Sequence, residues 1–335
     1  MTNSKRVTIK DIAKEAGVSA MAVSRVLSNK GGISQETSER ILAIAKKLNY
    51  RPNSIARSLR KQRTKTIGVI ASDSSELVFS QILRGVQDSA SAEGYDVIIA
   101  NTYQIPENEK HALNTMIDRR IDGLIFAAPM RTGKSDLEEL KHLGIPTVLL
   151  MRSGGLVGID SVSADNYIGG YEIVDYLLST RDDDIRFFPL SQSRSTGLER
   201  IAGYQNALSD HGRNWNERRV YYCEPTINDG YSAMAKLVQT GFKHGTVCCG
   251  CDLIAIGAIK AVQEANLKIP EDIRISGYDD IELSDYLSVP LTTMRQPKYD
   301  IGYEGVRLLL ERFNNPDMCS KQIVMRNELI IRKST

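Results

Sequence analysis

Residues 7–27 read VTIKDIAKEAGVSAMAVSRVL and carry the signals for two short helices joined by a tight turn. Thr8 and Asp11 have the spacing of a capping box, which predicts the start of the first helix. Gly17 supplies the positive φ that a turn between helices needs, and Ser19 predicts the N-cap of the second helix. Two short helices across a glycine turn are typical of a helix-turn-helix unit.

A third helix completes this unit. Ser34 predicts its N-cap, and we expect four apolar side chains to face inward: Ile41, Leu42, Ala45 and Leu48. The sequence therefore predicts an all-α head of three helices around one small core.

In a helix-turn-helix, the first residues of the second helix meet base edges in the major groove of DNA. Here these residues are Ser19, Ala20 and Met21, with Ser24 and Arg25 one turn later. Arg25 suits either a bidentate contact to guanine or a phosphate contact. Met21 suits either a thymine methyl or the helix surface.

The charges are distributed unevenly along the chain. Residues 1–65 hold 15 Lys and Arg against 4 Asp and Glu, a balance of +11. Residues 66–335 hold 28 against 37, a balance of −9. A basic head on an acidic body indicates that the head binds a polyanion.

A short basic segment follows the head. Residues 53–60 predict a helix of eight residues, which is marginal alone and needs a partner helix. Leu59 is an apolar side chain among arginines and lysines, so it suits a wedge between base steps of the minor groove. The alternative is a linker leucine without a role.

Residues 66–335 alternate β-branched runs with longer helical stretches, and the alternation restarts once. This pattern predicts parallel strands with crossover helices, in two doubly wound lobes. We expect strands at 67–71, 97–100, 123–127, 147–150, 185–189, 220–223, 247–251 and 273–278. A small molecule is expected in a cleft between the lobes.

Composition and motifs exclude several classes of protein. We find no apolar run long enough to span a membrane and no signal peptide, so we expect a cytoplasmic protein without a membrane partner. Cys248, Cys249 and Cys251 are expected to be buried strand thiols, with no metal site and no cofactor.

Two alternative functions remain. Residues 128–135, APMRTGKS, fit a relaxed P-loop and suggest an ATPase, but Pro129 lacks the amide that phosphate binding needs. No catalytic residue is identified, so we expect a protein that is not an enzyme. A pure ligand carrier is the second alternative, and it leaves the basic head unexplained.

Three runs of the head carry a resemblance to a known family. They are residues 7–13 (VTIKDIA), 16–19 (AGVS) and 23–27 (VSRVL), and they resemble the head of the lactose/galactose repressor family. Residues 50–53 (YRPN) and 56–59 (ARSL) look like that family's hinge. Ala22 departs from the usual threonine, so one phosphate contact is in doubt.

The resemblance implies a transcription regulator, most often a repressor, that binds an inverted-repeat operator as a homodimer. It implies DNA contacts from Thr8, Ser19, Ala20, Met21, Ser24, Arg25, Asn29, Tyr50, Asn53, Ala56, Arg57 and Leu59. Leu59 is then the minor-groove lever.

The body resembles the effector-binding core of the same family, which is similar to a type I periplasmic binding protein. Its landmarks include residues 200–204 (RIAGY), 277–280 (GYDD) and 291–293 (LTT). The resemblance implies that the effector is contacted by Asp73, Phe79, Arg152, Arg194, Thr196, Arg200, Asp252 and Asp279. Arg200 and Asp279 suit a carbohydrate, and Phe79 is either a stacking surface or core.

Two alternatives stay open at this site. Arg200 and Asp279 are either effector ligands or an ion pair across the cleft. Arg152, Arg194 and Arg200 together would favour an anionic metabolite over a neutral sugar.

The predicted organisation is a helix-turn-helix domain at 1–52, a hinge helix and linker at 53–65, and the core at 66–335. The resemblance divides the core into an N-lobe (about 66–162 and 292–322) and a C-lobe (about 163–291 and 323–335). Tetrameric relatives carry a further C-terminal leucine heptad, so a dimer is favoured. The sequence does not decide between an inducer and a corepressor.

Overall fold

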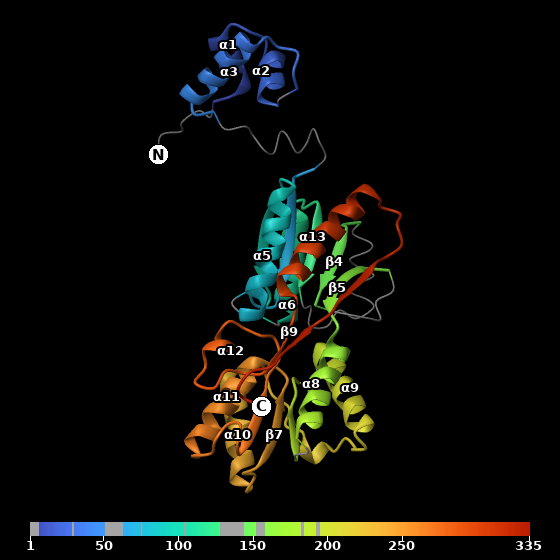
Figure 1. Cartoon of the computed structure of the whole chain (residues 1–335). Coiled ribbons are helices and arrows are strands. Elements are labelled where there is room, and N and C mark those ends of the chain that lie inside the picture. The colour runs from blue at the N-terminus through green and yellow to red at the C-terminus, as the bar shows by residue number, and fades with distance from the viewer. Residues whose placement is uncertain are drawn as a thin grey trace. The chain divides into compact units, whose positions relative to one another are not determined.

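The computed structural model describes residues 7–28, 30–50, 63–74, 76–103, 105–127, 144–151, 158–181, 184–191 and 195–335. Contacts divide the chain into two units, residues 1–64 and 65–335, and each is described by itself. The fold class predicted from the sequence is confirmed: a helix-turn-helix head is followed by an α/β core with parallel sheets (Figure 1).

The head contains the three predicted helices: α1 (Ile9–Ala16), α2 (Ala20–Leu27) and α3 (Gln35–Lys47). The amide of Thr8 donates to the Asp11 carboxylate at 2.8 Å, and Gly17 takes φ 65° in the turn. The buried side chains of the head core are Ile12, Ala13, Ala16, Val23, Ile41 and Ala45.

One predicted core residue of the head is wrong. Leu42 is 51% exposed, because Ile41 and Ala45, four residues apart, already occupy the inner face of α3. Leu42 is turned by about 100° from Ile41 around the helix axis and meets solvent.

The first sheet of the core has six strands in the order β10-β5-β4-β3-β1-β2, and all pairings are parallel. We call this sheet with its helices the N-lobe. Its strands are β1 (Thr66–Ala71), β2 (Asp96–Asn101), β3 (Gly123–Ala127), β4 (Thr147–Leu150), β5 (Asp160–Ala164) and β10 (Gln322–Met325). Its described helices are α5 (Leu77–Ala92), α6 (Pro106–Asp118) and α13 (Lys298–Asn314).

The second sheet has three parallel strands in the order β6-β7-β8. With its helices and the antiparallel ribbon β9–β11 it forms the C-lobe. Its strands are β6 (Ile185–Phe188), β7 (Gly245–Cys249), β8 (Ile273–Ser276), β9 (Thr293–Arg295) and β11 (Glu328–Ile330). Its helices are α8 (Asn166–Thr180), α9 (Ser195–Asp210), η1 (Glu217–Arg219), α10 (Ile227–Gln239), α11 (Asp252–Glu264) and α12 (Leu283–Tyr286).

Three strand predictions in the C-lobe are corrected, and the simplest is 273–278, which ends at residue 276. The predicted strand 220–223 makes only two isolated bridges, from Val220 to Phe187 and from Cys223 to Leu190. Pro189 lies between the two partners and has no amide to continue the ladder. The predicted strand 247–251 ends at residue 249, because residue 251 is already the N-cap of α11.

The chain passes between the two sheets three times: from β5 to α8, from β9 to α13, and from β10 to β11 (Figure 1). The predicted N-lobe segments end at residues 162 and 322, but Val162 and Gln322 lie on paired strands, β5 and β10, inside the six-stranded sheet. The observed crossings therefore fall a few residues after the predicted positions.

Close helix packing through glycine supports both lobes. Three helix pairs pack tightly, and each helix contributes a glycine whose added Cβ would lie 2.0–2.5 Å from a carbonyl oxygen of the partner helix. The pairs are Gly85 with Gly302 (α5 and α13), Gly170 with Gly203 (α8 and α9), and Gly230 with Gly257 (α10 and α11).

We predict that Gly203→Ala destabilises the protein. Replacing a glycine inside a helix with alanine normally stabilises it by up to about 1 kcal/mol. Here the new Cβ would lie 2.2 Å from the Tyr167 oxygen and 2.6 Å from the Tyr171 nitrogen, so we expect a loss of about 1–3 kcal/mol. Urea unfolding measures it, with the exposed Ser209→Ala in the same helix as the control. A Gly203→Ala variant as stable as the control would contradict this close packing.

Candidate functional site

The first residues of α2 are exposed. The Ser19 hydroxyl caps the helix by accepting a hydrogen bond from the Ala22 amide at 3.1 Å. Ala20 is exposed, and Met21 is the most exposed large apolar residue of the described head, at 74%. Val23 points the other way into the head core. The structure therefore presents residues 19–21 to a partner, as a DNA-reading helix requires.

The other predicted DNA-binding residues have varied positions. Arg25 is exposed in the last turn of α2, and its Nε donates to the Gly31 carbonyl at 3.2 Å. Thr8 donates its hydroxyl to Asp11 at 2.7 Å, and Tyr50 packs against the head core. Ser24 is half-buried on α2.

Several predicted site residues lie outside the described residues. They are Asn29, Asn53, Ala56, Arg57, Leu59, Arg152 and Arg194, together with most of the hinge and the P-loop-like segment 128–135. Their roles stay predictions.

In the core, Arg200 is the centre of a buried polar cluster. It lies on α9, is 3% exposed, and has its guanidinium carbon 3.6 Å from the centre of the Tyr278 ring. Its Nε donates to Asn166 Oδ1 at 3.0 Å, and its Nη1 donates to the Gly250 carbonyl at 2.6 Å. Its Nη2 lies 3.6 Å from Asp279 Oδ1, so the structure brings the two main predicted effector residues together.

Asp279 is held from two sides. It follows β8, and its Oδ1 accepts a hydrogen bond from Gln296 Nε2 at 2.6 Å. Its φ is 114° and that of Asp280 is 49°, two consecutive non-glycine residues in a conformation that costs about 1–3 kcal/mol each. Such strain persists only where neighbouring groups fix the backbone.

Lys298 is one of these neighbours. It is 3% exposed at the start of α13, and its Nζ donates to the carbonyl of Asp279 and, at 3.0 Å, to that of Asp280. Burial lowers the pKa of this ammonium. Because α13 packs on α5 in the N-lobe, Lys298 connects the N-lobe with the loop that carries Asp279.

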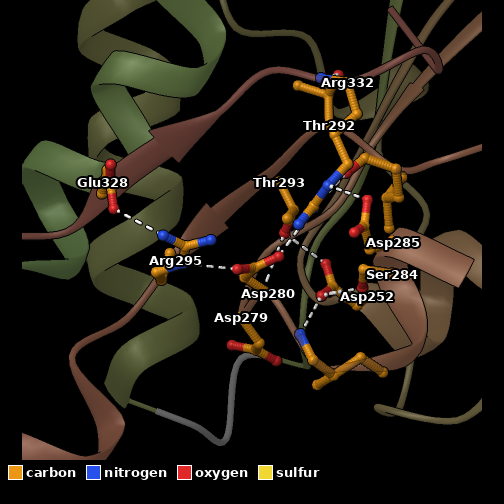
Figure 2. Close-up of polar contacts among 12 residues, drawn as sticks. Asp252, Asp279, Asp280, Ser284, Asp285, Thr292, Thr293, Arg295, Glu328 and Arg332 are labelled. Atoms are coloured by element: carbon orange, nitrogen blue, oxygen red, sulfur yellow. Dashed lines mark hydrogen bonds and ion pairs between the residues drawn. The ribbon is translucent and has the colours of Figure 1, made fainter.

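Asp252 is completely buried at the start of α11, and Figure 2 shows its carboxylate among donors from other segments. Oδ2 accepts hydrogen bonds from the Ile281 amide at 2.9 Å and the Ser284 hydroxyl at 2.6 Å, and Oδ1 accepts one from the Thr293 hydroxyl at 2.5 Å. Burial, and then repulsion from Asp279, raise its pKa to about 7. Asp252 thus holds the loop after β8 and the strand β9 together, and its role as an effector residue stays a prediction.

Asp280 belongs to a second layer of charge (Figure 2). Its carboxylate pairs with Arg295 at 2.7 Å and with Arg332 at 2.8 Å. Arg295 also pairs with Glu328, and Arg332 with Asp285. These ion pairs connect the β9–β11 ribbon to the loop after β8.

The remaining described candidates lie in different places. Asp73 follows β1 in the N-lobe and is half-buried, as is Thr196 in the first turn of α9. Phe79 is 3% exposed and packs in the core of the N-lobe, and its role as a stacking surface stays a prediction.

Sequence reasoning missed four members of the cluster: Asn166, Tyr278, Gln296 and Lys298. A signal for three of them was present, because the family landmarks also include residues 165–166 (DN) and 296–297 (QP), beside 277–280 (GYDD).

The cysteines of β7 are buried as predicted. Cys248 and Cys249 are fully enclosed, and burial raises the pKa of Cys248 to about 12. Among the residues that the structure describes, no His, Cys, Asp and Glu side chains are grouped as a metal site. The same residues include no helix with the length and apolar character to cross a membrane.

Comparison with known proteins identifies the class. Residues 8–53 match the family described as "Bacterial regulatory proteins, lacI family", and residues 64–330 match "Periplasmic binding proteins and sugar binding domain of LacI family". The chain belongs to the LacI family, and it is a DNA-binding transcription regulator with an effector-binding core.

Its relatives match over nearly the full chain. Catabolite control protein A of Priestia megaterium is 32% identical over 330 residues, covering 98% of this chain and 99% of the relative. The transcriptional repressor PurR of Haemophilus influenzae (strain PittEE) is 34% identical over 331 residues, covering 98% of each.

Solved structures agree with this assignment. A lac repressor dimer bound to operator and the anti-inducer ONPF is 25% identical, with TM-score 0.90 and 99% of each chain covered. A complex of the transcriptional regulator CelR with cellobiose is 26% identical, with TM-score 0.76, and the match covers 98% of this chain and 100% of that one.

We predict that Asp252 makes stability depend on pH. Its pKa is about 7 in the folded protein and 3.8 in an ordinary setting, so the folded state binds the proton more tightly. The stabilisation is complete below about pH 4 and is lost as the pH rises through 7, by at most about 1.4 kcal/mol per pH unit. Asp252→Asn should remove this component, and the exposed Asp285→Asn should retain it. Urea unfolding from pH 4.5 to 8 measures both variants, and identical pH profiles for wild type and Asp252→Asn would contradict the assignment.

Proposed function

We propose that this protein is a repressor that binds an inverted-repeat operator as a homodimer. Its affinity for the operator changes when a carbohydrate binds the core. It acts by binding alone and carries out no reaction. The observation that supports DNA reading is α2, whose first residues are exposed while the opposite face packs into the head core. Arg25 and Met21 then discriminate between bases. The net positive charge of the head attracts it to the DNA phosphates.

Exposed apolar side chains support the homodimer. On the C-lobe, Tyr286 of α12 is 79% exposed, and Leu283 of α12 and Ile227 at the start of α10 are partly exposed. On the N-lobe, the edge strand β2 exposes Ile99, and Tyr103 follows it. A second copy of the chain would cover these residues, and a dimer matches the two half-sites of an inverted repeat.

The buried cluster supports an uncharged, hydroxyl-rich effector rather than an anion. The Arg200 guanidinium is already engaged by Asn166, Gly250 and Asp279, so its positive charge is balanced. Asp279 and Arg200 side by side offer an acceptor and donors, which suits the hydroxyls of a sugar. Both oxygens of Asp252 already accept hydrogen bonds from the protein, so we assign it the role of fixing the loop that carries Asp279.

The coupling between effector and DNA would pass through the crossings. An effector that moves Asp279 also moves the carbonyls held by Lys298, and therefore α13 and the N-lobe. Coupling free energies of this kind are about 1–3 kcal/mol and reciprocal, so operator DNA must change effector affinity by the same factor.

The test of DNA reading is selection of bound duplexes from a random pool with the full chain at moderate salt. We expect an enriched inverted repeat, whose affinity falls steeply with salt because phosphate contacts release counterions. Met21→Ala should change the preferred base at one position of each half-site, and Leu42→Ala, exposed on α3, should not. Absence of enrichment with and without cell extract would contradict the proposal.

The test of the effector is titration calorimetry with cellobiose, ribose and ribose 5-phosphate. We expect heat from a neutral sugar, lost at least about tenfold in affinity in Asp279→Asn because hydrogen bonds to a charged group contribute roughly 1.5–3 kcal/mol. Asp118→Asn, an exposed carboxylate on α6 of the N-lobe, serves as the control. Binding of the phosphate ester alone would overturn the preference for a neutral effector.

A further inference from the structure

The loop after the recognition helix folds back onto Arg25. The Arg25 carbonyl accepts hydrogen bonds from the amides of Ser28 at 3.3 Å and Lys30 at 3.0 Å. The side chain of Arg25 is held by the same loop, because its Nε donates to the Gly31 carbonyl at 3.2 Å. Gly31 and Gly32 both take positive φ, 61° and 79°, which turns the loop back toward the end of α2.

The hydrogen bond from Nε to the Gly31 carbonyl determines which nitrogens of the Arg25 guanidinium can still bind DNA. With Nε engaged, Nη1 and Nη2 form the outer fork, which matches the paired acceptors O6 and N7 of guanine. A flexible arginine loses rotamer freedom when it binds, and an arginine already held in one orientation loses less.

Gly32 leaves the space that this orientation needs. A Cβ added at Gly32 would lie 2.5 Å from Nη2 of Arg25 and 3.3 Å from its Cζ. A Cβ added at Gly31 would meet nothing within 4 Å. A side chain at position 32 must therefore displace the guanidinium, and one at position 31 need not.

We propose that the Gly31 carbonyl and the open space at Gly32 orient Arg25 toward a guanine, which makes Gly32 a specificity-determining residue that never touches DNA. Gly32 acts through Arg25 and is a positioning residue. The inference rests on the proposed base contact of α2.

The experiment compares Gly31 and Gly32, which both have a positive φ, so an alanine at either position carries a similar backbone penalty. Full-length wild type, Gly31→Ala and Gly32→Ala are titrated with the duplex selected from the random pool and with duplexes in which each guanine position is changed in both half-sites. Wild type should discriminate against the wrong base at one position by roughly 5- to 150-fold. Gly32→Ala should lose discrimination at that position alone, and Gly31→Ala should keep it.

Arg25 variants make the test specific. Arg25→Ala should lose discrimination at the same base pair, and adding Gly32→Ala to it should cause no further loss. Arg25→Lys lacks Nε and the planar fork, so it should also lose discrimination while retaining affinity for random DNA. Gly32→Ala could lower binding to every duplex and so hide a change in discrimination. Arg25→Lys leaves both glycines in place and therefore still reports on the contact between residue 25 and the guanine.

Three results would overturn the inference: full discrimination in Gly32→Ala, equal losses in Gly31→Ala and Gly32→Ala, or guanine discrimination that survives Arg25→Lys. Failure of the wild-type protein to select any operator is a separate result. It would remove the proposed DNA-reading function, and this inference with it.

Discussion

Burial of the Asp252 carboxylate is the constraint on which the C-lobe depends. A buried carboxylate is unfavourable unless hydrogen-bond donors surround it, and here the donors come from three separate segments. The Thr293 hydroxyl belongs to the crossing strand β9, the Ser284 hydroxyl to α12, and the Ile281 amide to the loop after β8. The loop that carries Asp279 is therefore fixed by the same group that fixes the crossing strand.

Single side chains connect the first and third crossings to each other and the second crossing to the loop after β8. Asn327, after β10, donates to the Asp165 carbonyl at the first crossing and to the Tyr278 hydroxyl, both at 2.8 Å. Lys298 does the same at the second crossing for the carbonyls after β8. Polar links of this kind depend on geometry more than apolar contacts do, so relative movement of the lobes changes them first.

Local signals in the sequence were enough to predict where the three helices of the head begin. Thr8, Ser19 and Ser34 are N-caps, and a cap acts only on the turn that follows it. Strand 220–223 was mispredicted because its partner contains Pro189, which a pattern of β-branched residues does not reveal. Arg200 and Asp279 were predicted from family motifs, and the structure brings them together. Lys298 was missed because it binds the backbone carbonyls of Asp279 and Asp280. The positive φ that orients these carbonyls has no sequence signature.

Because the chain crosses between the lobes three times, the N-lobe and the C-lobe cannot fold one after the other as the ribosome makes the chain. The apolar face of the N-lobe sheet, with Val148, Leu150 and Val162, is covered by Ile301 and Leu309 of α13. The ribosome makes α13 only after nearly the whole C-lobe, a delay on the order of ten seconds at bacterial elongation rates. Of the two lobes, the N-lobe thus begins to emerge first and is completed last, and this face of its sheet lacks its covering helix while the C-lobe is made.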